Sequence, residues 1–245
     1  MTTTRGALAT LGCVAAALAA TACGPLDGTA EPASTALADQ SAGTIQKKAM
    51  AAMTSASAMT VDLDGVSDGE PMKYHMTMGK GGDCQGEVTV EGGTVRLIKV
   101  GPSLYMKGDD AFWKSQGSDG AAAQKLIGDR WMKTKADGPD SKDFLQACDL
   151  KQFLSEMEKE TGDGLGGKKG ESATVAGTPA LPITGKDGAE TVTAYVATKG
   201  EPYILKVVVK GGKEPGTVLF TDFDKPVKIT APAAKDSVDI DKLGG

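Results

Sequence analysis

Apolar and polar residues alternate with a period of two through much of the chain. The clearest case is residues 72–78, where methionine or tyrosine occupies every second position between polar residues. Such alternation is typical of a strand with one buried face. Similar patterns occur at 88–90, 95–97, 104–106 and 205–209, and Gly-rich or charged turns separate them. Because short connections join antiparallel neighbours, we expect an antiparallel sheet.

Three other segments have helical spacing. Residues 44–60 place Ile45, Ala49 and Met53 on one face, and residues 121–129 are a second candidate. Residues 141–160 form the clearest case, with these apolar positions: Phe144, Leu145, Cys148, Phe153, Leu154 and Met157. Asp140 is positioned to cap this segment, and a break near Asp149 would divide it into two short helices.

The order of these segments predicts an α+β fold. A helix comes first, then a strand meander, short helices, and a second run of strands over 168–231. For this order, the simplest packing places the helices together on one face of an antiparallel sheet. We expect about ten strands in a single domain that spans 44–245.

The N-terminus has the charge order of a secretory signal. Arg5 precedes an uncharged, alanine-rich run over 6–22, which is too short and too weakly apolar for a spanning helix. Small residues at 19–22 precede Cys23, which resembles a bacterial lipobox. We therefore expect 1–22 to be a lipoprotein signal peptide and Cys23 to become the acylated N-terminus. The alternative is ordinary cleavage, which leaves Cys23 as a free thiol.

These expectations place the protein outside the cytoplasm, anchored to the cell membrane. The two or three acyl chains of a lipoprotein anchor give durable membrane attachment, whereas one chain does not. Residues 23–43 then form the acylated N-terminus and a Gly- and Pro-containing flexible tether. A coil of this length spans about 25 Å.

Two cysteines remain in the expected exported body, Cys84 and Cys148. An even pair in an oxidising compartment most simply forms a disulfide. Two buried free thiols are the alternative. Metal binding is a weaker third possibility, because neither cysteine has a second ligand at a useful spacing.

Charge argues against nucleic-acid binding. The chain has 27 basic and 32 acidic residues, a formal net charge of −5, and charges of both signs are mixed along it. No basic block is present to contact phosphates or anionic headgroups. Neutral molecules or other envelope proteins are therefore the expected partners.

Two cofactor-binding glycine patterns occur in the sequence, but the predicted elements around them are not those that the motifs require. Residues 162–168 fit a dinucleotide or phosphate-loop glycine pattern, but the predicted order is helix then strand, the reverse of what both motifs need. We therefore interpret 162–168 as a linker and expect no cofactor.

Metal and catalytic sites are equally unsupported by the sequence. Asp62, Asp64, Asp68 and Glu70 are interrupted by Val66 and do not alternate as a calcium loop requires. His75 is the only histidine and lies on the polar side of its strand, so a catalytic triad or multi-histidine zinc site is unsupported. We expect no metal, no catalytic residue and no enzymatic activity.

Two patches of sequence carry a family resemblance. Residues 103–113 read Ser-Leu-Tyr-Met-Lys-Gly-Asp-Asp-Ala-Phe-Trp, and 216–232 include Phe-Thr-Asp-Phe-Asp-Lys-Pro-Val over 220–227, followed by Ile229. With the tethered Cys23 and the helix before the first strand, they resemble the LppX and LprG type of bacterial lipid-carrier lipoproteins, and more distantly the LolA type. In that family 220–229 correspond to the closing strand.

The resemblance implies a strongly curved antiparallel sheet, an incomplete β-barrel, with a few helices covering its concave face. It also implies an apolar cavity that accepts acyl chains such as palmitate for lipid transport, and no catalytic residues. The Cys84 and Cys148 pair departs from the family pattern, and a bridge there would constrain opening of the cavity.

Methionines give an independent indication of such a cavity. Six of the nine that follow residue 22 lie in 44–60 and 72–78. Their flexible, polarizable side chains repack around varied apolar ligands. We expect this set to line the cavity: Met50, Met53, Met76, Met78 and Val90. The alternative is that they fill an aromatic-poor core, in which case the protein is a surface interaction module without a ligand cavity.

Overall fold

The computed structural model describes residues 37–138, 141–161 and 167–243. Every described residue belongs to one compact unit, Pro32–Gly245. The expected signal peptide 1–22 and the acylation site Cys23 therefore lie outside the described residues. So does Asp140, the predicted helix cap.

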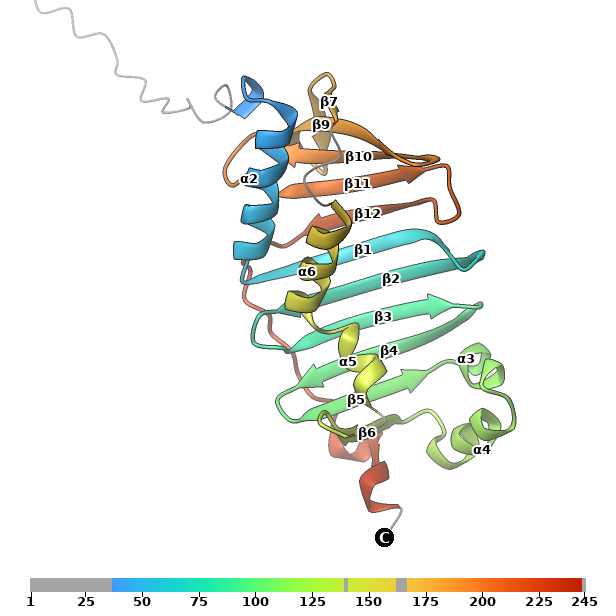
Figure 1. Ribbon diagram of the computed structural model, residues 1–245. Coiled ribbons are helices and arrows are strands. Elements are labelled where there is room, and N and C mark those ends of the chain that lie inside the picture. The colour runs from blue at the N-terminus through green and yellow to red at the C-terminus, as the bar shows by residue number, and fades with distance from the viewer. Residues whose placement is uncertain (1–36, 139–140, 162–166, 244–245) are drawn as a thin grey trace, which may run out of the picture. The chain divides into compact units, whose positions relative to one another are not determined.

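One 13-stranded sheet forms the body of the described unit (Figure 1). Its spatial order is β13-β6-β5-β4-β3-β2-β1-β12-β11-β10-β9-β7, with β8 also paired to β9. All pairs are antiparallel except β13 with β6, and the order does not close on itself. The strands are β1 Ala58–Ser67, β2 Glu70–Gly79, β3 Cys84–Val90, β4 Gly93–Val100, β5 Ser103–Gly108, β6 Trp131–Lys135, β7 Lys168–Lys169, β8 Ala173–Val175, β9 Thr178–Asp187, β10 Glu190–Ala197, β11 Ile204–Lys210, β12 Gly216–Thr221 and β13 Ser237–Asp239.

The two predicted meanders are confirmed, and they join through β1 and β12. These strands are distant in sequence but pair directly, with Asp62 opposite Leu219. Tight turns set the hairpins of the first meander. Asp68 and Gly69 connect β1 to β2 with φ of 52° and 85°, the conformation that a two-residue hairpin requires. Asp68 therefore lies in the turn, whereas Glu70 is the first residue of β2 and Asp62 and Asp64 belong to β1.

Among the described residues, five helices accompany the sheet: α2 Ala42–Ser55, α3 Asp110–Ser115, α4 Gly117–Ile127, α5 Lys142–Gln146 and α6 Leu150–Thr161. Short 3-10 turns, η2 Ala234–Asp236 and η3 Ile240–Lys242, flank β13. Helix α3 was not predicted. In the described part of the chain, no helix combines the length and apolar character needed to cross a membrane.

Helix α2 begins and ends earlier than the predicted 44–60. Its start is capped by Ser41, whose hydroxyl accepts from the Thr44 amide at 3.2 Å. Its end moves back because the chain from Ala58 onward pairs with β2, and sheet pairing there overrides helical spacing. Leu37, expected within the flexible tether, is buried in the core cluster.

The predicted break near Asp149 is confirmed. It separates α5 from α6, so the single apolar stripe of 141–160 belongs to two short helices. The Asp149 carboxylate accepts from the Gln152 amide at 2.9 Å and caps α6.

The closing strand is shorter than the resemblance implied. Strand β12 ends at Thr221 and does not continue to Ile229, because Asp222 and Asp224 adopt positive φ of 55° and 57°. The Asp224 carboxylate accepts from the Ser57 amide and hydroxyl and from the Tyr203 hydroxyl. This network fixes a turn at the point where a longer strand was expected.

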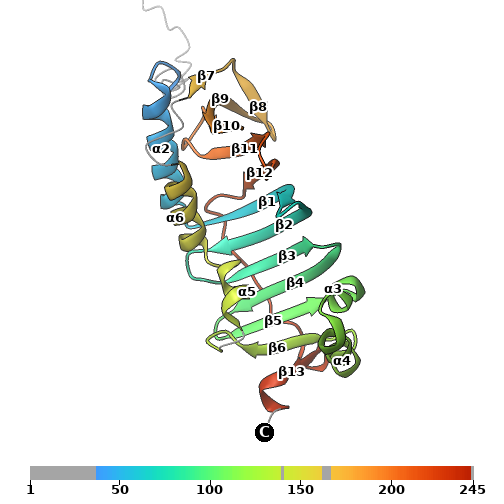
Figure 2. The same ribbon diagram turned by 45° about the vertical axis from the view of Figure 1, so that its right-hand side comes forward.

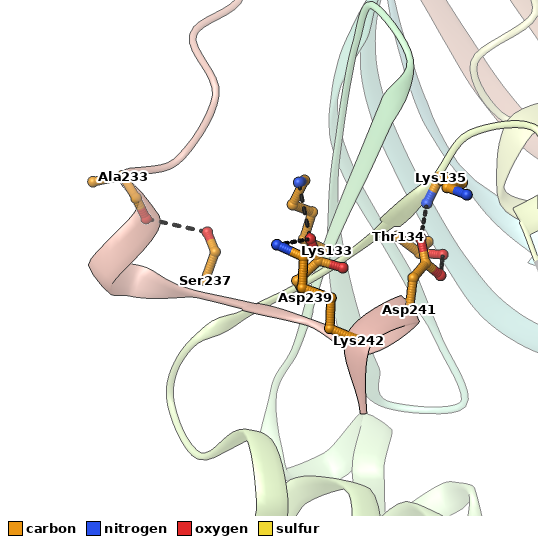
Figure 3. Close-up of polar contacts among 8 residues, drawn as sticks. All are labelled: Lys133, Thr134, Lys135, Ala233, Ser237, Asp239, Asp241 and Lys242. Atoms are coloured by element: carbon orange, nitrogen blue, oxygen red, sulfur yellow. Dashed lines mark hydrogen bonds and ion pairs between the residues drawn. The ribbon is translucent and has the colours of Figure 1, made fainter. Parts of the chain in front are cut away.

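The chain then continues to β13, which lies beside β6 (Figure 3). Lys133 donates from Nζ to Asp239 at 3.1 Å, and this hydrogen bond raises the pKa of Lys133. Asp241 accepts from the Thr134 hydroxyl at 2.9 Å and the Lys135 amide at 3.0 Å. Side chains as well as backbone therefore hold this short parallel strand.

Candidate functional site

The sheet has two chemically different faces. On β1 and β2, Val61 pairs with Met76 on one face, whereas Asp62 pairs with His75 on the other. We call these the inner face and the outer face. The main core cluster combines inner-face residues with residues of α2 and α6, and Figure 2 shows both helices on the same side of the sheet. The inner face is therefore the one that the helices cover.

Beneath the helices, two cross-strand rows of the inner face are sealed. We call the fully buried side chains that these rows contribute from β12 to β4 the covered rows: Met59, Val61, Met76, Met78, Cys84, Leu97 and Phe220. Each is at most 2% exposed. Burial of this extent, in contact with helix side chains, is the packing of a core.

Both covering helices contribute apolar side chains to this packing. From α2, Ile45, Ala49 and Met53 are buried. From α6, Leu154 is buried, and the Phe153 ring lies 6.3 Å from the Phe220 ring of β12, centroid to centroid. The period of 3.6 residues predicted these helix faces correctly.

The junction of α5 and α6 is attached to the sheet at two points. A disulfide joins Cys84 of β3 to Cys148, with Cα atoms 5.4 Å apart. The Tyr74 hydroxyl of β2 donates to the carbonyl of Ala147 at 2.7 Å. Burial raises the pKa of Tyr74 well above its usual range, so this hydroxyl remains protonated and able to donate.

One row further along the strands, the inner face is still apolar but less covered. The register aligns Val207, Val218, Leu63, Tyr74 and Val88 across five neighbouring strands.

The next row continues this surface. We call the half-buried apolar side chains of the two rows the open strip: Leu63, Met72, Tyr74, Val88, Val192, Val207, Val209 and Val218. Gly65 and Gly216 face each other within it. No inner-face position that the structure describes in these two rows from β10 to β3 is charged.

The outer face carries charged side chains on β1 to β4, and a second apolar cluster lies on β8 to β11. Asp62 pairs with His75 through Nδ1, and Arg96 with Glu87. A hollow of about 370 Å³ opens here among charged groups of both signs. The described residues include no group of three or more His, Cys, Asp or Glu side chains placed to hold a metal ion.

The five residues predicted from periodicity are now placed. Met53, Met76 and Met78 are fully buried within the core, and Met50 of α2 is half-buried against it. Val90 ends β3 opposite Met72, in the row of the open strip. That the five line a ligand cavity stays a prediction.

The sequence identified five members of the open strip as apolar strand positions, but not as site residues: Met72, Tyr74, Val88, Val207 and Val209. Leu63 stands between two aspartates, a visible alternation, but its neighbour Val218 lies on a strand distant in the chain. A continuous surface appears only once β1 is known to pair with β12. Val207 does belong to the predicted strand at 205–209, although its partner was unknown.

Two solved structures are similar to this chain. The crystal structure of LprF from Mycobacterium bovis aligns with a TM-score of 0.51 and 13% identity, covering 79% of this chain and 97% of that one. The crystal structure of the Mycobacterium tuberculosis lipoprotein LppX aligns with a TM-score of 0.49 and 13% identity, covering 80% and 99%. The structural similarity expected from the sequence is confirmed. At this identity it concerns the fold alone. No protein-family model and no curated protein matches the sequence.

Proposed function

We propose that this protein is a non-enzymatic carrier that binds a lipid or another long apolar molecule against the inner face of its sheet. The open strip carries the proposal. It presents eight half-buried apolar or tyrosine side chains beside a sealed core, whereas a sheet face directed to water is ordinarily polar. An extended apolar surface next to the covering helices is suited to an acyl chain.

The binding energy in this proposal is desolvation. Each methylene transferred from water to an apolar surface contributes about 0.8 kcal/mol, so a long chain needs no charged contact. This agrees with the lack of charge along the open strip. The methionines Met50, Met53, Met76 and Met78 would repack around the ligand when α2 and α6 move from the sheet.

The proposal also includes the curvature of the sheet. The resemblance to the LppX and LprG type implies a sheet that curves strongly around its ligand as an incomplete barrel. The positions of α2 and α6 on the inner face support it, since they lie where such a sheet would be concave. The shared fold with LprF is consistent with this arrangement.

The site of action is proposed to be the outer surface of the cell membrane. Arg5, the apolar run over 6–22 and Cys23 supply the signal and the acylation site. The Cys84–Cys148 disulfide supports an oxidising compartment. Anchoring through Cys23 would place the carrier beside the membrane lipids from which it draws its ligand.

Native mass spectrometry tests the proposal directly. A Cys23→Ser variant cannot be acylated at that residue and can be purified from the secreted fraction without detergent. We expect it to retain an apolar molecule through purification, and to bind fluorescent fatty acid after delipidation. A protein that is consistently empty and fails to bind the fatty acid would contradict a carrier and favour an interaction module.

A further inference from the structure

Helix α2 places a polar amide on its covered side. The Oε1 atom of Gln46 is buried and has no hydrogen-bond partner among the residues that the structure describes. Buried polar groups in native proteins are nearly always paired, so this oxygen calls for a partner such as a bound water or a ligand.

The position of Gln46 on the helix shows what it faces. Gln46, Met50 and Met53 follow at spacings of four and three residues and share one flank, along which exposure falls from half-buried to fully buried. The opposite flank, with Lys48 and Ala51, is exposed. Because α2 packs against α6, β10 and β11, the flank of Gln46 is the one directed toward the neighbouring elements.

The amide oxygen therefore lies in line with two methionines of the predicted ligand cavity. Nearby positive charge is already engaged or directed elsewhere. Lys169 donates to the carbonyls of Ala38 and Gln40 at 2.7 and 2.9 Å, and Lys47 is exposed. The unpartnered polar atom on this flank is thus a neutral acceptor, the Oε1 atom of Gln46.

We infer that Gln46 accepts a hydrogen bond from a hydroxyl group of the bound apolar molecule. The inference rests on the proposed carrier function and specifies its ligand class: an uncharged lipid that bears a hydroxyl, such as a monoacylglycerol, a diacylglycerol or a long-chain alcohol. An ionised fatty acid offers only acceptors and lacks the donor that this oxygen needs. Gln46 is a specificity-determining residue in this inference.

Two probes with the same acyl chain test it. In the full chain carrying Cys23→Ser, 1-palmitoylglycerol and methyl palmitate compete with a pyrene-labelled alkane for binding. We expect Gln46→Leu to weaken binding of 1-palmitoylglycerol about fivefold, the loss that corresponds to one hydrogen bond of ordinary net strength. Methyl palmitate should bind equally well or better, since leucine is apolar.

A matched substitution controls for the chemical change itself. Gln85→Leu makes the same replacement at an exposed position whose neighbours on the adjacent strands lie on the outer face, and it should change neither affinity. Gln46→Met provides a second variant if leucine disturbs α2, because methionine already occupies this flank at Met50 and Met53.

The outcomes separate the inference from the function on which it rests. If both probes bind and the affinity ratio is the same for wild type, Gln46→Leu and Gln46→Met, the inference is wrong and the carrier function stands. The same holds if loss of the amide weakens methyl palmitate as much as 1-palmitoylglycerol. If wild type binds neither probe nor the alkane, both are overturned.

Discussion

The covered rows and the open strip lie side by side on the same strands, yet they differ in burial. Met76 and its neighbour Val61 are at most 1% exposed, whereas Leu63 and Tyr74, two residues along the same strands, are half-buried. Side-chain chemistry does not explain the difference, because both regions are apolar. The coverage by α2 and α6 does. Stability and ligand binding should therefore respond to different rows of one surface.

The largest expected effect comes from a charge in the covered rows. Met76→Lys buries an unpaired ammonium and should lower the free energy of unfolding by about 5 kcal/mol, enough to prevent folding of an ordinary domain. Leu63→Lys should cost less than about 2 kcal/mol, because the long side chain can extend to water from the open strip. Urea unfolding monitored by circular dichroism measures both. Equal costs would contradict the distinction between the regions.

Removing the disulfide should weaken the attachment of the helices to the sheet. The bridge closes a loop across a sequence separation of 64 residues, so Cys84→Ala with Cys148→Ala should lower the free energy of unfolding by about 4 kcal/mol in the chain-entropy model. Chemical denaturation under non-reducing conditions gives this value. Dithiothreitol should reduce wild-type stability toward that of the double variant and leave the variant unchanged.

Ligand binding, unlike stability, should depend on the open strip more than on the covered rows. Leu63→Lys places a charge where an acyl chain is proposed to lie, and we expect it to weaken binding of a fluorescent palmitate analogue at least about tenfold, a loss of about 1.4 kcal/mol. Lys73→Leu, one strand away on the outer face and exposed, is the control and should leave the affinity unchanged. Unaltered binding by folded Leu63→Lys would remove the open strip from the site.

A smaller effect is expected where the two regions meet the α5–α6 junction. Tyr74→Phe removes the hydroxyl that donates to Ala147 and leaves that carbonyl without this partner. We expect the free energy of unfolding to fall by about 1 kcal/mol. Amide hydrogen exchange should show the loss of protection first in α5 and α6, and protection lost first in β10 and β11 would argue against this role.

The smallest effect concerns pH and the turn after β12. Hydrogen bonds from Tyr203, then from the amide and hydroxyl of Ser57, lower the pKa of Asp224. A carboxylate with a lowered folded-state pKa stabilises the fold above its unfolded pKa of about 4, and this contribution disappears as pH falls through the folded value. The stability difference between wild type and Asp224→Asn should be constant from pH 7 to pH 5 and shrink below about pH 4. A difference independent of pH down to pH 2.5 would exclude the ionic contribution.

Local patterns predicted local structure well. The alternation of Met72 to Met78 identified β2, and the break at Asp149 separated α5 from α6. Long-range pairing was not accessible in the same way. Nothing in the residues of β1 specifies β12 as its partner, and the three residues of β13 are too few to show a period.

The candidate site could not be predicted in full, because it depends on long-range strand pairing and on where the helices pack. Periodicity identified Met76 and Met78 as apolar and inward, but it could not distinguish a sealed row from an open one, because coverage depends on where α2 and α6 dock. Gln46 was likewise not predicted as a site residue. A single glutamine on an amphipathic helix is common, and only its burial without a partner singles it out.

The edges of the sheet have a consequence for encounters between copies of the protein. At one end the last strand is β13, with three residues, and at the other β9 is flanked by β7 and β8, with two and three. An approaching molecule therefore meets very little unpaired backbone at either margin, and Lys168 and Lys169 add like charge at one of them. Molecules crowded together should consequently resist growing into a shared ribbon, even though each exposes long antiparallel strands.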